Sequence, residues 1–150
     1  MVENSVFESV LMSIHPEFVR LILNGKKKVE FRKIRFSIDV SHVVIYATLP
    51  IKKIVGYFEV KNINTGSPDE LWSSYRNIGG IEEERFYEYY KNYSNGIAIE
   101  IGEVYKLDNY LPLSYISSSA PPQSYSYINR KTFEQIVGMI HRKTESTLRR

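Results

Sequence analysis

The chain of 150 residues contains no cysteine. Without thiols there are no disulfide bonds, cysteine-ligated zinc sites or cysteine nucleophiles, and this composition suits a reducing compartment. No apolar run reaches the roughly 18 residues that a membrane-spanning helix needs. The first residues, Met1 to Asn4, also lack the basic start of a signal peptide. We therefore expect a cytoplasmic protein with no membrane partner.

Sequence signatures of common cofactor and metal sites are missing too. The three histidines, His15, His42 and His141, are far apart and show no metal-ligand spacing. A Gly-x-Ser-x-Gly elbow, a P-loop and a dinucleotide-binding fingerprint are all absent. The sequence therefore predicts neither a bound metal nor a cofactor.

Positive charge is concentrated in two segments, although the net charge is only +3. Between residues 18 and 35, seven basic residues accompany one acidic residue, and between 129 and 150 six accompany two. Clustered basic residues favour a polyanionic partner, because contact with phosphates releases condensed counterions. Two solvated basic surfaces without a partner would give the same pattern, so charge alone leaves both interpretations open.

Hydrophobic periodicity predicts strands and helices that alternate along the chain. Strands are expected over residues 10–14, 28–32, 42–47, 54–63 and 97–107, most of them rich in β-branched and aromatic residues. Helices are expected after Pro16, from Pro68 to Tyr75 and over residues 81–90. A capping-box pattern that starts at Thr132 predicts a last helix.

This order of elements is typical of an α+β fold built on a small curved sheet or barrel. We expect a single domain over residues 1–150, with its core at about residues 10–128. Residues 129–150 are expected to form a basic C-terminal helix.

A pattern after the first predicted helix carries a family resemblance. Gly-x-Lys-x-x-Glu-x-Arg falls on Gly25, Lys27, Glu30 and Arg32. The strand sequences Val-Ile-Tyr-Ala and Ile-Val-Gly-Tyr-Phe-Glu-Val follow, and Pro-Pro-Gln-Ser-Tyr stands at residues 121–125. Over roughly residues 10–107 the sequence resembles the ASCH (activating signal cointegrator homology) family. The segment at 121–125 is similar to the closing segment of its small stand-alone prokaryotic and phage members.

The resemblance implies a PUA-like small β-barrel with a cleft lined by this motif. Family members include presumed RNA-binding regulators and small enzymes that remove acyl groups from the exocyclic amine of cytidine. A ribonuclease activity has also been attributed to a member. Because one fold supports several functions, the resemblance does not choose among these.

The motif residues have chemistry suited to binding a nucleotide. Glu30 and Arg32, two apart on a strand, face the same side. The carboxylate can accept hydrogen bonds from a base, and the guanidinium can bind a phosphate or a carbonyl. Lys27 beside them would become a candidate base or nucleophile if burial lowered its pKa. The alternatives are a structural Glu30–Arg32 ion pair and a solvated lysine.

Other residues are candidates to complete the site. An aromatic ring can stack on a base, and hydroxyl and amide groups can hydrogen-bond it. Basic side chains near the motif can contact phosphates. The candidates for nucleotide binding are Ser13, Tyr46, Gln123, Ser124 and Tyr125, and those for phosphate contact are Arg20, Lys26, Lys28 and Lys33.

Two functional hypotheses follow. The first is a module that binds RNA or another single-stranded nucleic acid, or a modified nucleoside, with a regulatory role left open. The second is an enzyme, either an amidohydrolase acting on an acylated cytidine, with Lys27 and Glu30 as catalytic residues, or a ribonuclease. The amidohydrolase relatives combine the motif lysine with a threonine where this chain has Glu30, so their catalytic set is not carried over intact.

Overall fold

The computed structural model describes residues 9–116 and 120–148, with side chains described as far as residue 140. Its described elements are one six-stranded sheet, four α-helices and a short 3-10 helix. In chain order they are β1 (Ser9–Ile14), α1 (Pro16–Leu23), β2 (Val29–Arg32), β3 (His42–Ala47), β4 (Lys53–Gly66), α2 (Pro68–Tyr75), α3 (Glu83–Tyr89), β5 (Gly96–Leu111), η1 (Leu113–Ile116), β6 (Tyr125–Ile128) and α4 (Arg130–Leu148).

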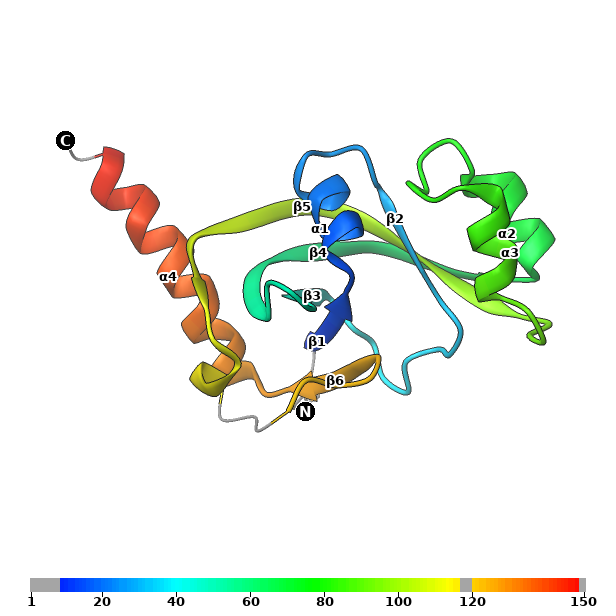
Figure 1. Cartoon of the computed structure of the whole chain (residues 1–150). Helices are drawn as coiled ribbons and strands as arrows, with labels where there is room; N and C mark the ends of the chain where they lie inside the picture. The colour runs from blue at the N-terminus through cyan, green and yellow to red at the C-terminus, as the bar shows by residue number, and fades with distance from the viewer. Residues whose placement is uncertain (1–8, 117–119, 149–150) are drawn as a thin grey trace.

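The sheet is a curled half-barrel with the strand order β2-β5-β4-β3-β1-β6 (Figure 1). β1 runs parallel to β3, and every other neighbouring pair is antiparallel. The long strands β4 and β5 shift register at several points, and such irregularities let a strand bend. Within the described chain, the edge strands β2 and β6 do not pair with each other, which leaves a seam on one side of the half-barrel.

The helix α1 lies across the inner face of the sheet and ends just before the motif. Pro16 occupies its first turn, and Val19 and Ile22 are buried against the sheet. Gly25 follows the helix with a φ of +82°, a left-handed conformation that glycine adopts without strain. This turn sends the chain directly into β2, so the motif residues lie at the end of α1.

Three hydrophobic clusters hold the fold together. The inner cluster lies between the sheet and α1. A second, here called the α4 cluster, lies between the sheet and α4, where Ile136 is fully buried. A third packs α2 and α3 against β2 and β5. Figure 1 shows α4 at one end of the molecule and the α2–α3 pair at the other, with α1 between them.

The expected α+β class is therefore correct, and α2 has the bounds that the sequence predicts. Its capping box is present, because Ser67 accepts from the Glu70 N–H and Glu70 accepts from the Ser67 N–H. The last helix starts close to the expected residue 129, but the capping-box pattern at Thr132 does not mark its first turn. α4 begins at Arg130, because the side chain of Asn129 accepts the Thr132 N–H at 2.8 Å and caps the helix earlier than that pattern predicts.

Candidate functional site

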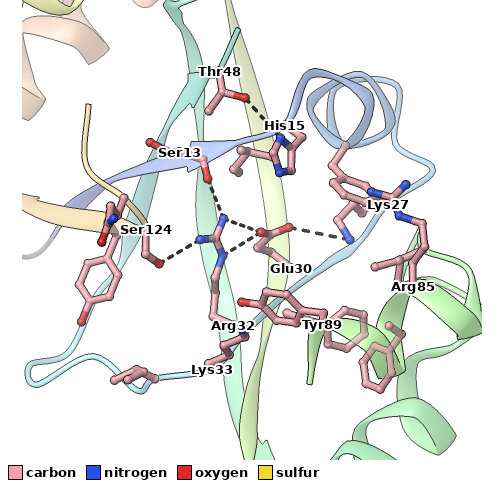
Figure 2. Close-up of a pocket in the computed structure, with 18 residues that line it drawn as sticks. Ser13, His15, Lys27, Glu30, Arg32, Lys33, Thr48, Arg85, Tyr89 and Ser124 are labelled. Carbon is pink, nitrogen blue, oxygen red and sulfur yellow. Dashed lines mark hydrogen bonds and ion pairs between the residues drawn. The ribbon is translucent and has the colours of Figure 1, made fainter. Parts of the chain in front are cut away.

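A cavity of about 610 Å³ opens at the seam of the half-barrel (Figure 2). This volume falls within the roughly 300–1,000 Å³ that is typical of small-molecule sites. β1, α1, β2, α3 and the segment before β6 all contribute to its wall. The lining residues are Ser13, Ile14, His15, Phe18, Lys27, Glu30, Phe31, Arg32, Lys33, Ile34, Thr48, Ile81, Arg85, Phe86, Tyr89, Gln123, Ser124 and Tyr125.

Lys27 lies at one end of the cavity with only 3% of its surface exposed. Its Nζ donates a hydrogen bond to the carbonyl of Gly79, in the connection between α2 and α3. The ammonium also lies 5.0 Å from the ring centre of Phe18 and 5.5 Å from that of Phe31. Burial lowers the pKa of Lys27, since the charged form loses its hydration, and Arg32 adds to this effect while Glu30 opposes it.

Glu30 occupies the centre of a row of charges. Its Oε2 accepts from Arg32 Nε at 2.9 Å and lies 2.8 Å from Arg32 Nη2. Its Oε1 lies 3.8 Å from the Nζ of Lys27, an ion pair longer than a hydrogen bond. Figure 2 shows the carboxylate between the two basic side chains, so one negative charge forms ion pairs with two positive charges.

Arg32 bridges the seam of the half-barrel. From β2, its Nη2 donates to the backbone carbonyl of Ser13 in β1 at 2.8 Å, and its Nη1 donates to Ser124 Oγ at 3.0 Å. Ser13 Oγ in turn donates to the carbonyl of Pro122 at 2.7 Å. The hydroxyl of Tyr90 donates to the carbonyl of Arg32 at 2.8 Å. These bonds tie strands together that the sheet itself leaves unpaired.

The rest of the wall combines aromatic rings with two cations, the half-buried Lys33 and the exposed Arg85. Lys33 Nζ lies 4.5 Å from the ring centre of Tyr89 and 4.8 Å from that of Tyr93. The guanidinium of Arg85 lies 5.0 Å from the ring centre of Phe18 and pairs with an exposed glutamate, Glu17, at 2.8 Å. Burial raises the pKa of Tyr89 to about 12, so its hydroxyl remains protonated at neutral pH.

Most of the residues that the sequence singled out lie together in this cavity. Lys27, Glu30 and Arg32 form its row of charges, and Ser13, Lys33, Gln123, Ser124 and Tyr125 line the rest. The exposed phosphate candidates Arg20, Lys26 and Lys28 do not line it.

Tyr46 also lies outside the cavity lining. In β3 it shares a face with Val44 and is buried in the α4 cluster, with 3% of its surface exposed. Alternation along the strand sends Ile45 and Ala47 to the opposite face, into the inner cluster. The ring is therefore packed as core in this structure, and we assign it no part in stacking.

Sequence reasoning missed part of the wall. Arg85 and Tyr89 are one helical turn apart on α3, a spacing that places both on one face of a helix. That spacing was visible, but the packing of α3 beside the motif was not. Gly79, whose carbonyl binds Lys27, belongs to a Gly-Gly pair that signals only a turn.

No group of three or more potential metal-ligating side chains occurs among the residues that the structure describes. None of the helices in the described part of the chain is long and apolar enough to cross a membrane.

Comparison with known proteins places this geometry in a family. The ASCH domain family model matches residues 12–110. An "ASCH domain-containing ribonuclease" from Zymomonas mobilis is 27% identical over 136 residues, which cover 88% of this chain and 92% of the relative.

Solved structures agree with the sequence match. The crystal structure of ASCH from Zymomonas mobilis superimposes with a TM-score of 0.80 at 26% identity, covering 88% of this chain and 95% of that one. The N-terminal domain of Staphylothermus marinus McrB shares the fold with a TM-score of 0.57 at 14% identity, covering 91% and 98%. The family match, which spans more than half of the chain, and the shared fold agree, and the chain belongs to the ASCH domain family.

Proposed function

We propose that the protein binds single-stranded RNA and takes one nucleotide into the cavity at the seam. The observation that carries this proposal is the composition of the cavity. Buried charges that can hydrogen-bond a base lie at one end, and a tyrosine with a half-buried lysine beside it lines another part of the wall. Unpaired bases are the part of RNA that proteins read with stacking rings and hydrogen bonds.

In this proposal the residues that line the cavity have different roles. Glu30 and Lys27 face the base, while Tyr89 supplies a ring on which it stacks. Lys33 and Arg85 contact the phosphates. Arg32 acts mainly as a positioning residue, because four of its polar contacts go to Glu30, Ser13 and Ser124.

The test is a titration of fluorescently labelled single-stranded RNA at several salt concentrations. Lys33→Ala is expected to weaken binding and to reduce the slope of log affinity against log salt by about 0.7, the value for one phosphate contact on a single strand. Lys26→Ala is the matched control, because it removes an exposed lysine outside the cavity. Tyr89→Leu is expected to weaken binding roughly tenfold through lost stacking. Binding that is unchanged in both Lys33→Ala and Tyr89→Leu contradicts the proposal.

RNA cleavage is a second candidate, favoured by the similarity to the ASCH domain-containing ribonuclease of Zymomonas mobilis. The test is incubation of the purified protein with single-stranded RNA labelled at one end, with Lys27→Met as the variant and Lys26→Met as its control. Cleavage by the wild type and the control, but not by Lys27→Met, supports a catalytic role. An acylated cytidine included as a second substrate tests the amidohydrolase hypothesis in the same assay.

A further inference from the structure

Two buried charges in the cavity have hydrogen-bonding capacity that the described protein groups leave unused. Lys27 Nζ carries three N–H donors and makes one protein hydrogen bond, to Gly79. Glu30 Oε1 accepts no hydrogen bond from the described residues, because Arg32 binds Oε2 and Lys27 is 3.8 Å away. Both residues are more than nine-tenths buried, at 3% and 6% exposure.

Such an arrangement is costly without a partner. A buried charged group with unfilled hydrogen-bonding capacity loses hydration that the protein does not replace. Both groups line the cavity, and Figure 2 shows the two side chains facing each other across a short gap. A ligand that presents a donor and an acceptor on neighbouring atoms would satisfy both groups at once.

The hydrogen-bonding roles of Lys27 and Glu30 are fixed. Lys27 as an ammonium only donates, and Glu30 as a carboxylate only accepts. The ligand must therefore direct an N–H at Glu30 and an acceptor at Lys27. A lactam edge, in which a ring N–H adjoins a carbonyl, meets this requirement in uracil and guanine. Cytosine and adenine instead pair an amino group with a ring nitrogen.

The lactam edge suits this site better for two reasons. The carbonyl oxygen has two lone pairs and accepts over a broad range of directions, whereas a ring nitrogen has a single lone pair in the plane. Lys27 is already held by Gly79, so its remaining donors have little freedom to reorient. The imino N–H of a lactam is also more acidic than an amino group, which strengthens a bond to a carboxylate.

The walls fit a planar ring in this orientation. Phe18 and Phe31 flank the Lys27 ammonium, and Tyr89 lines the same cavity. Apolar walls with a few placed polar groups are the usual composition of small-molecule sites, where the polar groups fix the orientation. We propose that the cavity recognises a uracil or guanine base by its lactam edge, with its ring N–H bonded to Glu30 and its carbonyl to Lys27. This inference rests on the proposed binding of RNA.

The experiment compares ligands that differ only at this edge. Binding of uridine 5′-monophosphate is measured by calorimetry against 3-methyluridine 5′-monophosphate, which lacks the ring N–H, and 5-methyluridine 5′-monophosphate, which keeps it. We expect the 5-methyl compound to bind like uridine and the 3-methyl compound to bind about tenfold more weakly or worse, because it gives Glu30 Oε1 no hydrogen-bond donor. Guanosine and 1-methylguanosine monophosphates form the purine pair, and cytidine monophosphate tests the amino edge.

Protein variants identify the two groups involved. Lys27→Met and Glu30→Gln are expected to reduce the preference for uridine over 3-methyluridine, whereas Lys26→Met, outside the cavity, keeps it. The comparison of ligands on the wild-type protein needs no variant, so it remains decisive even if a variant fails to fold.

Oligonucleotides separate this inference from the proposed function. Single-stranded oligouridine and oligocytidine of equal length are titrated with the wild type and with Tyr89→Leu. Tighter binding of oligouridine supports the lactam edge. Equal binding of both strands that weakens in Tyr89→Leu overturns the lactam inference and leaves RNA binding in the cavity intact. Equal binding that does not respond to Tyr89→Leu or to Lys33→Ala overturns both.

Discussion

Lys27 is a buried charge whose lost hydration the protein replaces only in part. A lysine at 3% exposure with one hydrogen bond and a 3.8 Å ion pair is poorly solvated by its protein surroundings. Two aromatic rings, Phe18 and Phe31, recover part of the loss through cation–π contact. Burying such a side chain lowers the stability of the fold. It also suits ligand binding, because a ligand can supply the missing hydrogen bonds.

This cost predicts a pH dependence of stability. Burial lowers the pKa of Lys27 below its usual 10.5, so the folded protein releases this proton at lower pH than the unfolded chain does. Between the two pKa values the unfolded chain binds more protons, and the free energy of unfolding therefore rises with pH. Below this window Lys27 is charged in both states and the full cost of burial remains.

The measurement is urea unfolding of wild type and Lys27→Met at pH values from neutral to 10.5. The difference in unfolding free energy is expected to shift in favour of the wild type as the pH rises through the window. The control is Lys26→Met, whose exposed side chain carries no burial cost, so its difference from wild type is expected to stay flat. A flat difference for Lys27→Met would show that its charge is well solvated.

At the scale of single residues, the sequence predicts which charged groups belong to the site, but it does not predict their burial or their distant partners. The spacing of Glu30 and Arg32 predicts that both lie on one face of a strand, and the two side chains form the ion pair that is one of the sequence-based interpretations. Burial of Lys27 in a run of three lysines depends on Gly79, which is 52 residues away. A contact between residues so far apart in the sequence cannot be predicted from the residues that neighbour Lys27.

The connection between α2 and α3 is the element that encloses the site. The Lys28 N–H donates to the carbonyl of Ile78 at 2.8 Å, and Lys27 reaches Gly79. Gly80 has a φ of +65°, and a Cβ added there would lie 2.7 Å from the Cβ of Lys27. The connection can therefore pack this closely against Lys27 only because residue 80 is a glycine.

Gly80→Ala is expected to lower stability and weaken RNA binding together, because it adds a clash with the stem of Lys27 to the strain of a positive φ. Gly25→Ala is the matched control. It also has a positive φ, but nothing lies within 4 Å of the added carbon, so it is expected to cost stability of about 1 kcal/mol while binding is retained. Urea unfolding and RNA titration measure the two effects. Equal losses of binding in both variants would contradict the role given to this connection.

Elements themselves were largely readable from the sequence, and their positions relative to one another were not. Proline at the first helical turn and the Ser67–Glu70 capping box identified α1 and α2, because these signals are local. The packing of α3 beside the cavity depends on the third hydrophobic cluster, which joins Phe31 to Phe86. Such a pairing of distant aromatic residues has no signature in a single sequence.

For the whole molecule, α4 raises the question of where the domain ends. Phe133, Ile136 and Val137 belong to or pack on the α4 cluster, together with Leu11 and Leu107 from the sheet. The sequence predicted a basic C-terminal helix, and its basic residues from position 141 onward lie outside the described side chains. From the buried face of this helix we propose that it is an integral part of the domain.

Deletion of residues 130–150 is therefore expected to abolish cooperative unfolding, because it uncovers the α4 cluster. A milder variant, Ile136→Ala, is expected to lower the unfolding free energy by about 2–5 kcal/mol, the usual cost of truncating a large buried aliphatic side chain. Thermal and urea unfolding measure both. A deletion variant that unfolds cooperatively at the wild-type midpoint would show that the helix is dispensable for the domain.

The bridge made by Arg32 has a consequence for the order of events during synthesis of the chain. Its partners Ser13 and Ser124 are 111 positions apart, and the contact between Ser13 and Pro122 spans almost the same distance. A ribosome translates Ser13 and the motif first, and the segment that forms the other wall, with Pro122 and Ser124, follows much later in the chain. Until that segment has been added, a nascent chain carries the charged residues of the motif without the closed cavity.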